Sequence, residues 1–160
     1  MGSKLALLTT VLCLAWAGTG LAADTSGKGM AKDEYKAEKD RIKADAKAAK
    51  DKCKGMSGNA KDICMAEAKG NEKVAKAELE ARYKPSAKNE RDVAIAKADA
   101  EYGTAKERCD DKAGKDKDAC KKEAKAAHSR AVAEAKANTK TAEAKQERRE
   151  AARESKGTSK

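Results

Sequence analysis

Two stretches of the chain decide the fold: Cys53-Lys-Gly-Met-Ser-Gly-Asn-Ala-Lys-Asp-Ile-Cys64 and Cys109-Asp-Asp-Lys-Ala-Gly-Lys-Asp-Lys-Asp-Ala-Cys120. Each stretch places ten residues between two cysteines and contains glycine. A shift of 56 residues superimposes both cysteine pairs without a gap and brings Gly58 onto Gly114. A repeat of this period is usually one supersecondary unit. The sequence therefore predicts two tandem copies of one structural unit.

Each unit is predicted to be a helical hairpin. The less polar positions of segment 31–53 recur every three, four or seven residues, and those from Ile95 to Cys109 repeat the pattern, which is typical of a helix with one buried face. These stripes are Tyr35, Ile42, Ala46, Ala49 and Cys53, then Ile95, Ala98, Tyr102, Ala105 and Cys109. The glycines between the paired cysteines favour a turn.

Signals at the ends of the helices fix their expected limits. Asn59 followed by Asp62 resembles a capping pair that starts a second helix, and Pro85 stops it, because the residue before proline avoids the helical region. Ser86 is a candidate cap for the third helix. The fourth is expected from about Asp116 through residue 132 and on to 150, with 157–160 frayed. Gly70 is expected to weaken the second helix.

The composition allows only a small core. Charged residues make up 40% of the chain, aromatic residues 2%, and phenylalanine is absent. Such a composition lies near the limit of disorder, but alanine, lysine, glutamate and arginine are strong helix formers. We therefore expect an all-α, elongated or coiled-coil-like protein: hairpin 1 over 24–84, and hairpin 2 with a charged C-terminal helix over 85–156.

The pairing of Cys53, Cys64, Cys109 and Cys120 has two readings. If the ten intervening residues were helical, the paired cysteines would lie about 16 Å apart, too far for a disulfide. Bridges would then join Cys53 to Cys120 and Cys64 to Cys109. If the segments are turns, each pair closes locally, which the glycines favour and which would contribute about 3 kcal/mol.

The first 23 residues have the three parts of a cleaved secretory signal. Lys4 gives a short basic region, residues 5–16 are almost all apolar, and small residues lead to Ala22 and Ala23. The apolar run is too short to span a bilayer. Cleavage near Ala22 or Ala23 would discard Cys13, so we expect no lipidation. The mature protein is predicted to be periplasmic or secreted, where paired thiols oxidise.

The residues give little support for catalysis, a cofactor or a metal. Structural zinc sites use cysteines two to four residues apart, often with histidine, whereas the spacing here is ten and His128 is the only histidine. His128 lies in a polar helical segment and is interpreted as a solvated side chain. The acidic residues alternate with lysines at helical spacing and are expected to form ion pairs. The chain is therefore predicted not to be an enzyme.

The net charge of +10 allows two interpretations. Lysine-rich faces keep alanine-rich helices soluble, or they bind an anionic partner such as lipopolysaccharide, an acidic polymer or extracellular DNA. Because the lysines are spread along the helices, such binding would be weak and sensitive to salt. No helix has the broad apolar face needed for membrane insertion, and self-association is compatible with the pattern.

Several segments resemble small exported Ala/Lys-rich helical proteins of proteobacteria, often loosely labelled TolA-like cell-envelope proteins. They include 50–53, 59–64, 67–70, 76–85 and 105–114. The resemblance to TolA itself is compositional and transfers no bridging function. From the export signal, the paired cysteines and the composition, we predict an exported structural or interaction protein of the cell envelope. A basic binder of anionic envelope polymers is the alternative.

Overall fold

The computed structural model describes residues 30–157, which form four helices. They are α1 (Lys32–Cys53), α2 (Gly58–Tyr83), α3 (Ala87–Cys109) and α4 (Gly114–Gly157). The expected all-α fold with helical hairpins is confirmed. The expected signal sequence, cleavage site and Cys13 lie outside the described residues.

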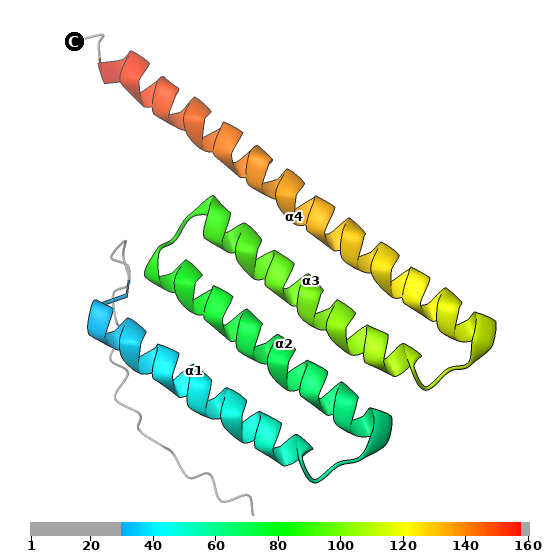
Figure 1. The fold of residues 1–160 in the computed structure, drawn as a ribbon. Helices are drawn as coiled ribbons and strands as arrows, with labels where there is room; N and C mark the ends of the chain where they lie inside the picture. Colours follow the sequence, from blue (N-terminus) through cyan, green and yellow to red (C-terminus); the bar gives the residue numbers. More distant parts are fainter. Residues whose placement is uncertain (1–29, 158–160) are drawn as a thin grey trace, which may run out of the picture.

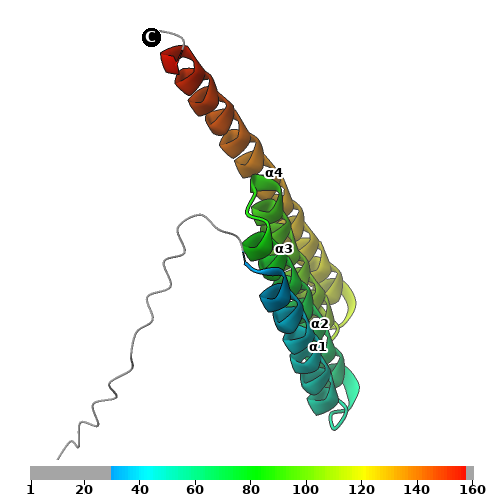
Figure 2. The same ribbon diagram turned by 90° about the vertical axis from the view of Figure 1, so that its left-hand side faces the viewer.

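The helices run alternately up and down and lie side by side in one layer (Figures 1 and 2). Within residues 30–157, α1 packs only on α2, and α4 packs only on α3. The most extensive interface is between α2 and α3, which joins the two hairpins. Because no second layer covers this one, both broad faces of the layer are open.

Both turns between the paired cysteines are closed by the aligned glycines. Gly58 has φ +56° and Gly114 has φ +52°, in the left-handed region that favours glycine. Each glycine is the first residue of the following helix, so α4 begins two residues before the expected Asp116. The turns lie at the same end of the layer (Figure 1).

The caps agree with expectation at one helix and differ at another. Ser86 caps α3, where its Oγ accepts a hydrogen bond of 3.1 Å from the amide of Asn89. The Asn59–Asp62 capping pair is wrong, because α2 begins at Gly58 and the Asn59 side chain points elsewhere. Its Nδ2 donates to the carbonyl oxygen of Glu107 at 2.7 Å, which ties the start of α2 to the end of α3.

The core is a line of small residues along the helix interfaces. The predicted stripe on α1 is confirmed, since Ile42, Ala46 and Cys53 are buried, and the stripe on α3 buries Ala98 and Cys109. Leu79 is the largest fully buried side chain, with 1% of its surface exposed. At the end of the α1–α2 hairpin, Tyr35 stacks on Tyr83 with ring centroids 4.3 Å apart, and its hydroxyl donates to Glu80.

Gly70 was expected to weaken α2, and the structure shows that the residue also has a role in packing. A Cβ atom at Gly70 would lie 2.7 Å from the Cβ of Ala100, so the missing side chain lets α2 and α3 approach closely. Gly70 itself is buried. The glycine thus lowers the helix propensity of α2 but allows the two hairpins to pack closely against each other.

The fourth helix is much longer than its neighbour. It has 44 residues and α3 has 23, so its C-terminal part runs past the end of the layer (Figure 1). Within residues 30–155, Thr139 is the last buried residue, and residues 140–155 are all exposed. The expected continuation through Glu150 is confirmed.

Candidate functional site

The four predicted cysteines form two local disulfides at the turn end of the layer. Cys53 bonds to Cys64, which joins α1 to α2, and Cys109 bonds to Cys120, which joins α3 to α4. The Cα atoms of each pair are 5.6 Å apart, within the usual range for a disulfide. Local closure, the reading that the glycines favoured, is confirmed. Cross-pairing between the hairpins is not present.

One broad face of the layer carries shallow grooves, and we call it the groove face. A groove of about 740 Å³ crosses α2, α3 and α4 and includes Glu67, Asn71, Glu101 and Glu123 in its lining. A second groove, of about 520 Å³, lies between α1 and α2 and also reaches Asn71. A third, lined by Lys52, shares both Glu67 and Asn71 with the first. The three grooves therefore belong to one face.

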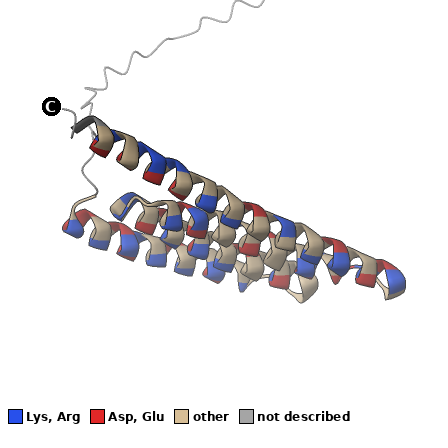
Figure 3. Cartoon of the chain, turned by 90° about the horizontal axis from the view of Figure 1, so that it is seen from above, with Lys and Arg blue, Asp and Glu red and all other residues tan. Residues whose placement is uncertain are grey.

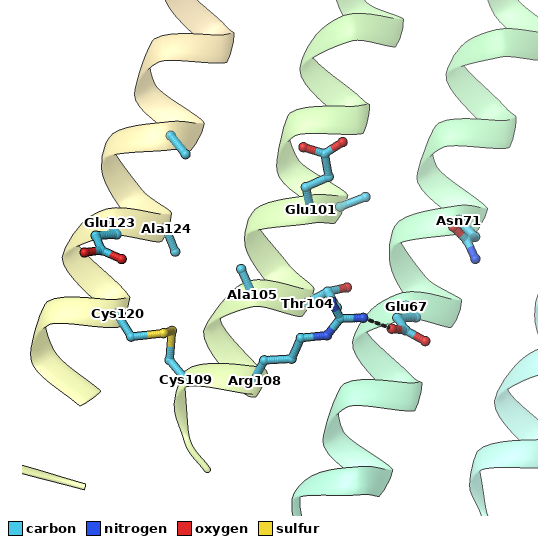
Figure 4. A pocket seen from close by; sticks show the side chains of 12 residues that line it. Glu67, Asn71, Glu101, Thr104, Ala105, Arg108, Cys109, Cys120, Glu123 and Ala124 are labelled. Atoms are coloured by element: carbon cyan, nitrogen blue, oxygen red, sulfur yellow. Dashed lines mark hydrogen bonds and ion pairs between the residues drawn. A yellow bond between two sulfur atoms is a disulfide. The ribbon is translucent and has the colours of Figure 1, made fainter. Parts of the chain in front are cut away.

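The groove of about 740 Å³ has an ion pair between two of its lining residues. Arg108 Nη2 lies 2.8 Å from Glu67 Oε1, which links α3 to α2 (Figure 4). Glu101 and Glu123 also line this groove, beside the Cys109–Cys120 bridge, and have no ion-pair partner within the described residues. The charged side chains of this groove that lack an ion-pair partner are therefore negative.

The opposite broad face carries rows of lysines, and we call it the lysine face. On α2, Lys69 and Lys73 line a groove with Gly70 and Gly103. These lysines are two residues from Glu67 and Asn71, and two residues turn a helix by about 200°. Lys69 and Lys73 therefore project from the side of α2 opposite the groove face.

The lysine face continues across the other helices. On α1, Lys50 meets Lys76 of α2 at a shared carboxylate, Glu72, with both N–O distances 2.5 Å. On α4, Lys117 and Lys121 share Asp110, at 2.9 and 2.7 Å. Spacings of three and four residues place further lysines on the same sides of their helices. The lysine face includes Lys36, Lys43, Lys47, Lys50, Lys54, Lys69, Lys73, Lys76, Lys106, Lys117, Lys121 and Lys125.

Shared carboxylates hold neighbouring lysines in place and are themselves strongly acidic. Hydrogen bonds from Lys50 and Lys76 lower the pKa of Glu72 to about 2, and those from Lys121 and Lys117 lower the pKa of Asp110 to about 2. Both carboxyl groups are therefore ionised throughout the ordinary pH range. Each is surrounded by more positive charge than it neutralises.

His128 is more enclosed than expected. Its Nε2 lies 2.5 Å from Asp99 Oδ1 on α3, and its ring stacks on Tyr102 with centroids 4.9 Å apart. The side chain retains 24% exposure, so it is partly solvated while it also packs between α3 and α4. The contacts join α4 to α3, and the spacing of Tyr102 in the predicted stripe could have suggested an aromatic partner there.

The described residues contain no cluster of three or more His, Cys, Asp or Glu side chains able to hold a metal ion. Among those same residues, no helix is long and apolar enough to cross a membrane. Positive and negative residues alternate along every helix (Figure 3), and this alternation concealed the separation of the two faces in the sequence. The sequence signal that could have revealed the two faces is the spacing of the lysines along each helix. This spacing can be interpreted only when the neighbouring helices are known.

Comparison with known proteins finds no family model, curated protein or solved structure that matches this chain.

Proposed function

We propose that the protein is an exported structural or interaction protein of the cell envelope, without catalytic activity. The observation that carries this proposal is the single layer of helices, which is stapled by two disulfides and presents two broad open faces. Disulfides of this kind persist in oxidising compartments outside the cytosol. The thin layer offers extended surface for contact and little volume in which to enclose a substrate.

The test is to locate the protein and recover what it contacts. We expect the native protein in the periplasmic or secreted fraction, with both cysteine pairs oxidised. Chemical cross-linking in intact cells, followed by purification under denaturing conditions, should recover envelope components. A cytosolic protein with both cysteine pairs reduced would contradict the proposal, as would a turnover activity retained by highly purified protein.

A second candidate function is binding of an anionic envelope polymer, and the lysine face favours it. Twelve lysines from the four helices and the α1–α2 turn lie on that face, whereas the groove of about 740 Å³ on the other face has unpaired glutamates. Retention on immobilised heparin that falls steeply with salt would support this function. Elution at low salt, equal to that of a protein of similar net charge but unordered lysines, would argue against it.

A further inference from the structure

The two faces differ in the sign of their unpaired charge. Of the twelve lysines named on the lysine face, four have neither an ion pair nor a ring contact among the described residues: Lys36, Lys69, Lys73 and Lys125. Asp62 and Glu107 are the unpaired acids that line its groove. Asp110, which also lies on this side, is paired with two lysines, and Glu72 at the α1–α2 interface is likewise paired with two lysines. Asp99 contacts the ring of His128. The lysine face therefore has an excess of accessible positive charge.

This charge is distributed over an area and does not follow one line. Lys36 is on α1, Lys69 and Lys73 are on α2, and Lys125 is on α4. Helix axes in contact are about 8–10 Å apart, so four adjacent helices spread these groups over roughly 30 Å across the layer. A linear polymer following one helix would meet only one or two of them. A flat anionic surface would meet all of them at once.

The described residues also limit how such a surface could be engaged. Met56 is the only large hydrophobic side chain that is exposed, at 47%, in residues 30–155. Peripheral helices that insert into a bilayer use a continuous apolar face, which this layer does not have. The contact must therefore be electrostatic, between lysine ammonium groups and surface phosphates.

We propose that the lysine face lies flat on an anionic lipid surface, with Lys36, Lys69, Lys73 and Lys125 contacting the phosphate headgroups. This inference rests on the second candidate function and deepens it by naming the partner. In that orientation the groove face points away from the lipid and remains available to a second partner. Basic groups near an anionic membrane bind with a strength that depends on the number of lysines and on screening.

The test is co-sedimentation of the oxidised, mature protein with vesicles of phosphatidylcholine containing about 30% phosphatidylglycerol. The variant K69Q/K73Q removes two unpaired charges from the lysine face. The matched control is K52Q/R130Q, which removes two charges from the groove face. Lys52 lines a groove there, and Arg130 follows Glu123 and Ala127 by seven and three residues on α4. Circular dichroism should show equal helix content in both variants.

We expect the wild-type protein to bind these vesicles at about 0.01 M salt and to be released at about 1 M, where the Debye length falls to about 3 Å. The K69Q/K73Q variant should bind about thirtyfold more weakly, from about fivefold for each lysine. The control should lose less than about fivefold. Vesicles of phosphatidylcholine alone should bind neither protein.

Three results would overturn the proposal. Equal losses in the two variants would mean that net charge alone drives binding. If the protein is retained on heparin but does not bind vesicles, the partner is a soluble polymer and the second candidate function is still supported. If the protein binds neither heparin nor vesicles, the second candidate function is refuted as well. A change of oligomeric state in K69Q/K73Q alone, seen by light scattering, would make the lysine face an interface between copies of this chain.

Discussion

Replacing Gly70 with alanine should destabilise the protein, although alanine is the better helix former. The added Cβ would lie 2.7 Å from Ala100 Cβ and 3.1 Å from Ala100 Cα, whereas carbon atoms in contact prefer about 3.5–4.0 Å. The helices α2 and α3 would have to separate by about 1 Å. They form the most extensive interface of the layer, so this displacement affects many contacts.

The expected magnitude follows from two opposing contributions. Alanine gains about 1 kcal/mol of helix propensity over glycine, and overpacking of a tight interface costs about 1–3 kcal/mol. We therefore expect Gly70→Ala to lower the free energy of unfolding by about 1 kcal/mol. The matched control is Gly103→Ala in α3, where a new Cβ meets no atom within 4 Å. That variant should be stabilised by about 1 kcal/mol.

Urea unfolding of the oxidised proteins, followed by circular dichroism, measures this difference of about 2 kcal/mol. The double variant Gly70→Ala/Ala100→Gly removes the clashing methyl group, so its destabilisation should be smaller than the sum of the single effects. If Gly70→Ala stabilises the protein as much as Gly103→Ala does, the close approach of α2 and α3 does not exist. Strict additivity in the double variant would lead to the same conclusion.

Further outcomes follow from the disulfides, the shared carboxylates and the N-terminus. Reduction should leave much of the helix signal at low temperature but abolish a cooperative melt, since two closed loops of about 3 kcal/mol each would be lost; a sharp transition of the reduced protein above about 60 °C would refute this. Because the pKa of Glu72 is lowered to about 2 in the folded state from an ordinary value of 4.5, its pairing stabilises the fold fully above pH 4.5, and this contribution disappears as pH falls toward 2. Glu72→Gln should therefore flatten the acid limb of the stability profile by about 1 kcal/mol, which urea titrations at several pH values would reveal. Intact mass of the exported protein should correspond to a mature N-terminus at Ala23 or Asp24; a mass that includes Met1, or a lipid on Cys13, would contradict the predicted processing.

Local features of the sequence predicted most of the secondary structure. Recurrence at three and four residues located the buried stripes on α1 and α3, and the aligned glycines Gly58 and Gly114 located both turns. Ser86 and Pro85 fixed the gap between the hairpins. These features depend on residues close together in the chain, so a single sequence is enough to read them.

The packing between hairpins could not be read in the same way. The α2–α3 interface uses small side chains, and Gly70 and Ala100 give no hydrophobic signal that separates a contact from a solvated alanine face. Asn59 looked like a helix cap, but its partner, Glu107 O, is far away in sequence. The lysine face likewise exists only because neighbouring helices turn their lysines the same way, which depends on the arrangement of the layer.

The two repeats differ at the positions that join them. Under the 56-residue shift, Gly70 corresponds to Ala126 and Ala100 corresponds to Ala44. Gly70 and Ala100 meet in the α2–α3 interface, whereas Ala126 and Ala44 are exposed. A further helix approaching α4 at Ala126 as closely as α3 approaches α2 would meet a Cβ atom where α2 has none. The glycine thus makes the contact between hairpins specific to α2 and α3. The same repeat that produces two similar hairpins therefore gives one tight junction between them, and the outer edges of the layer do not reproduce that junction.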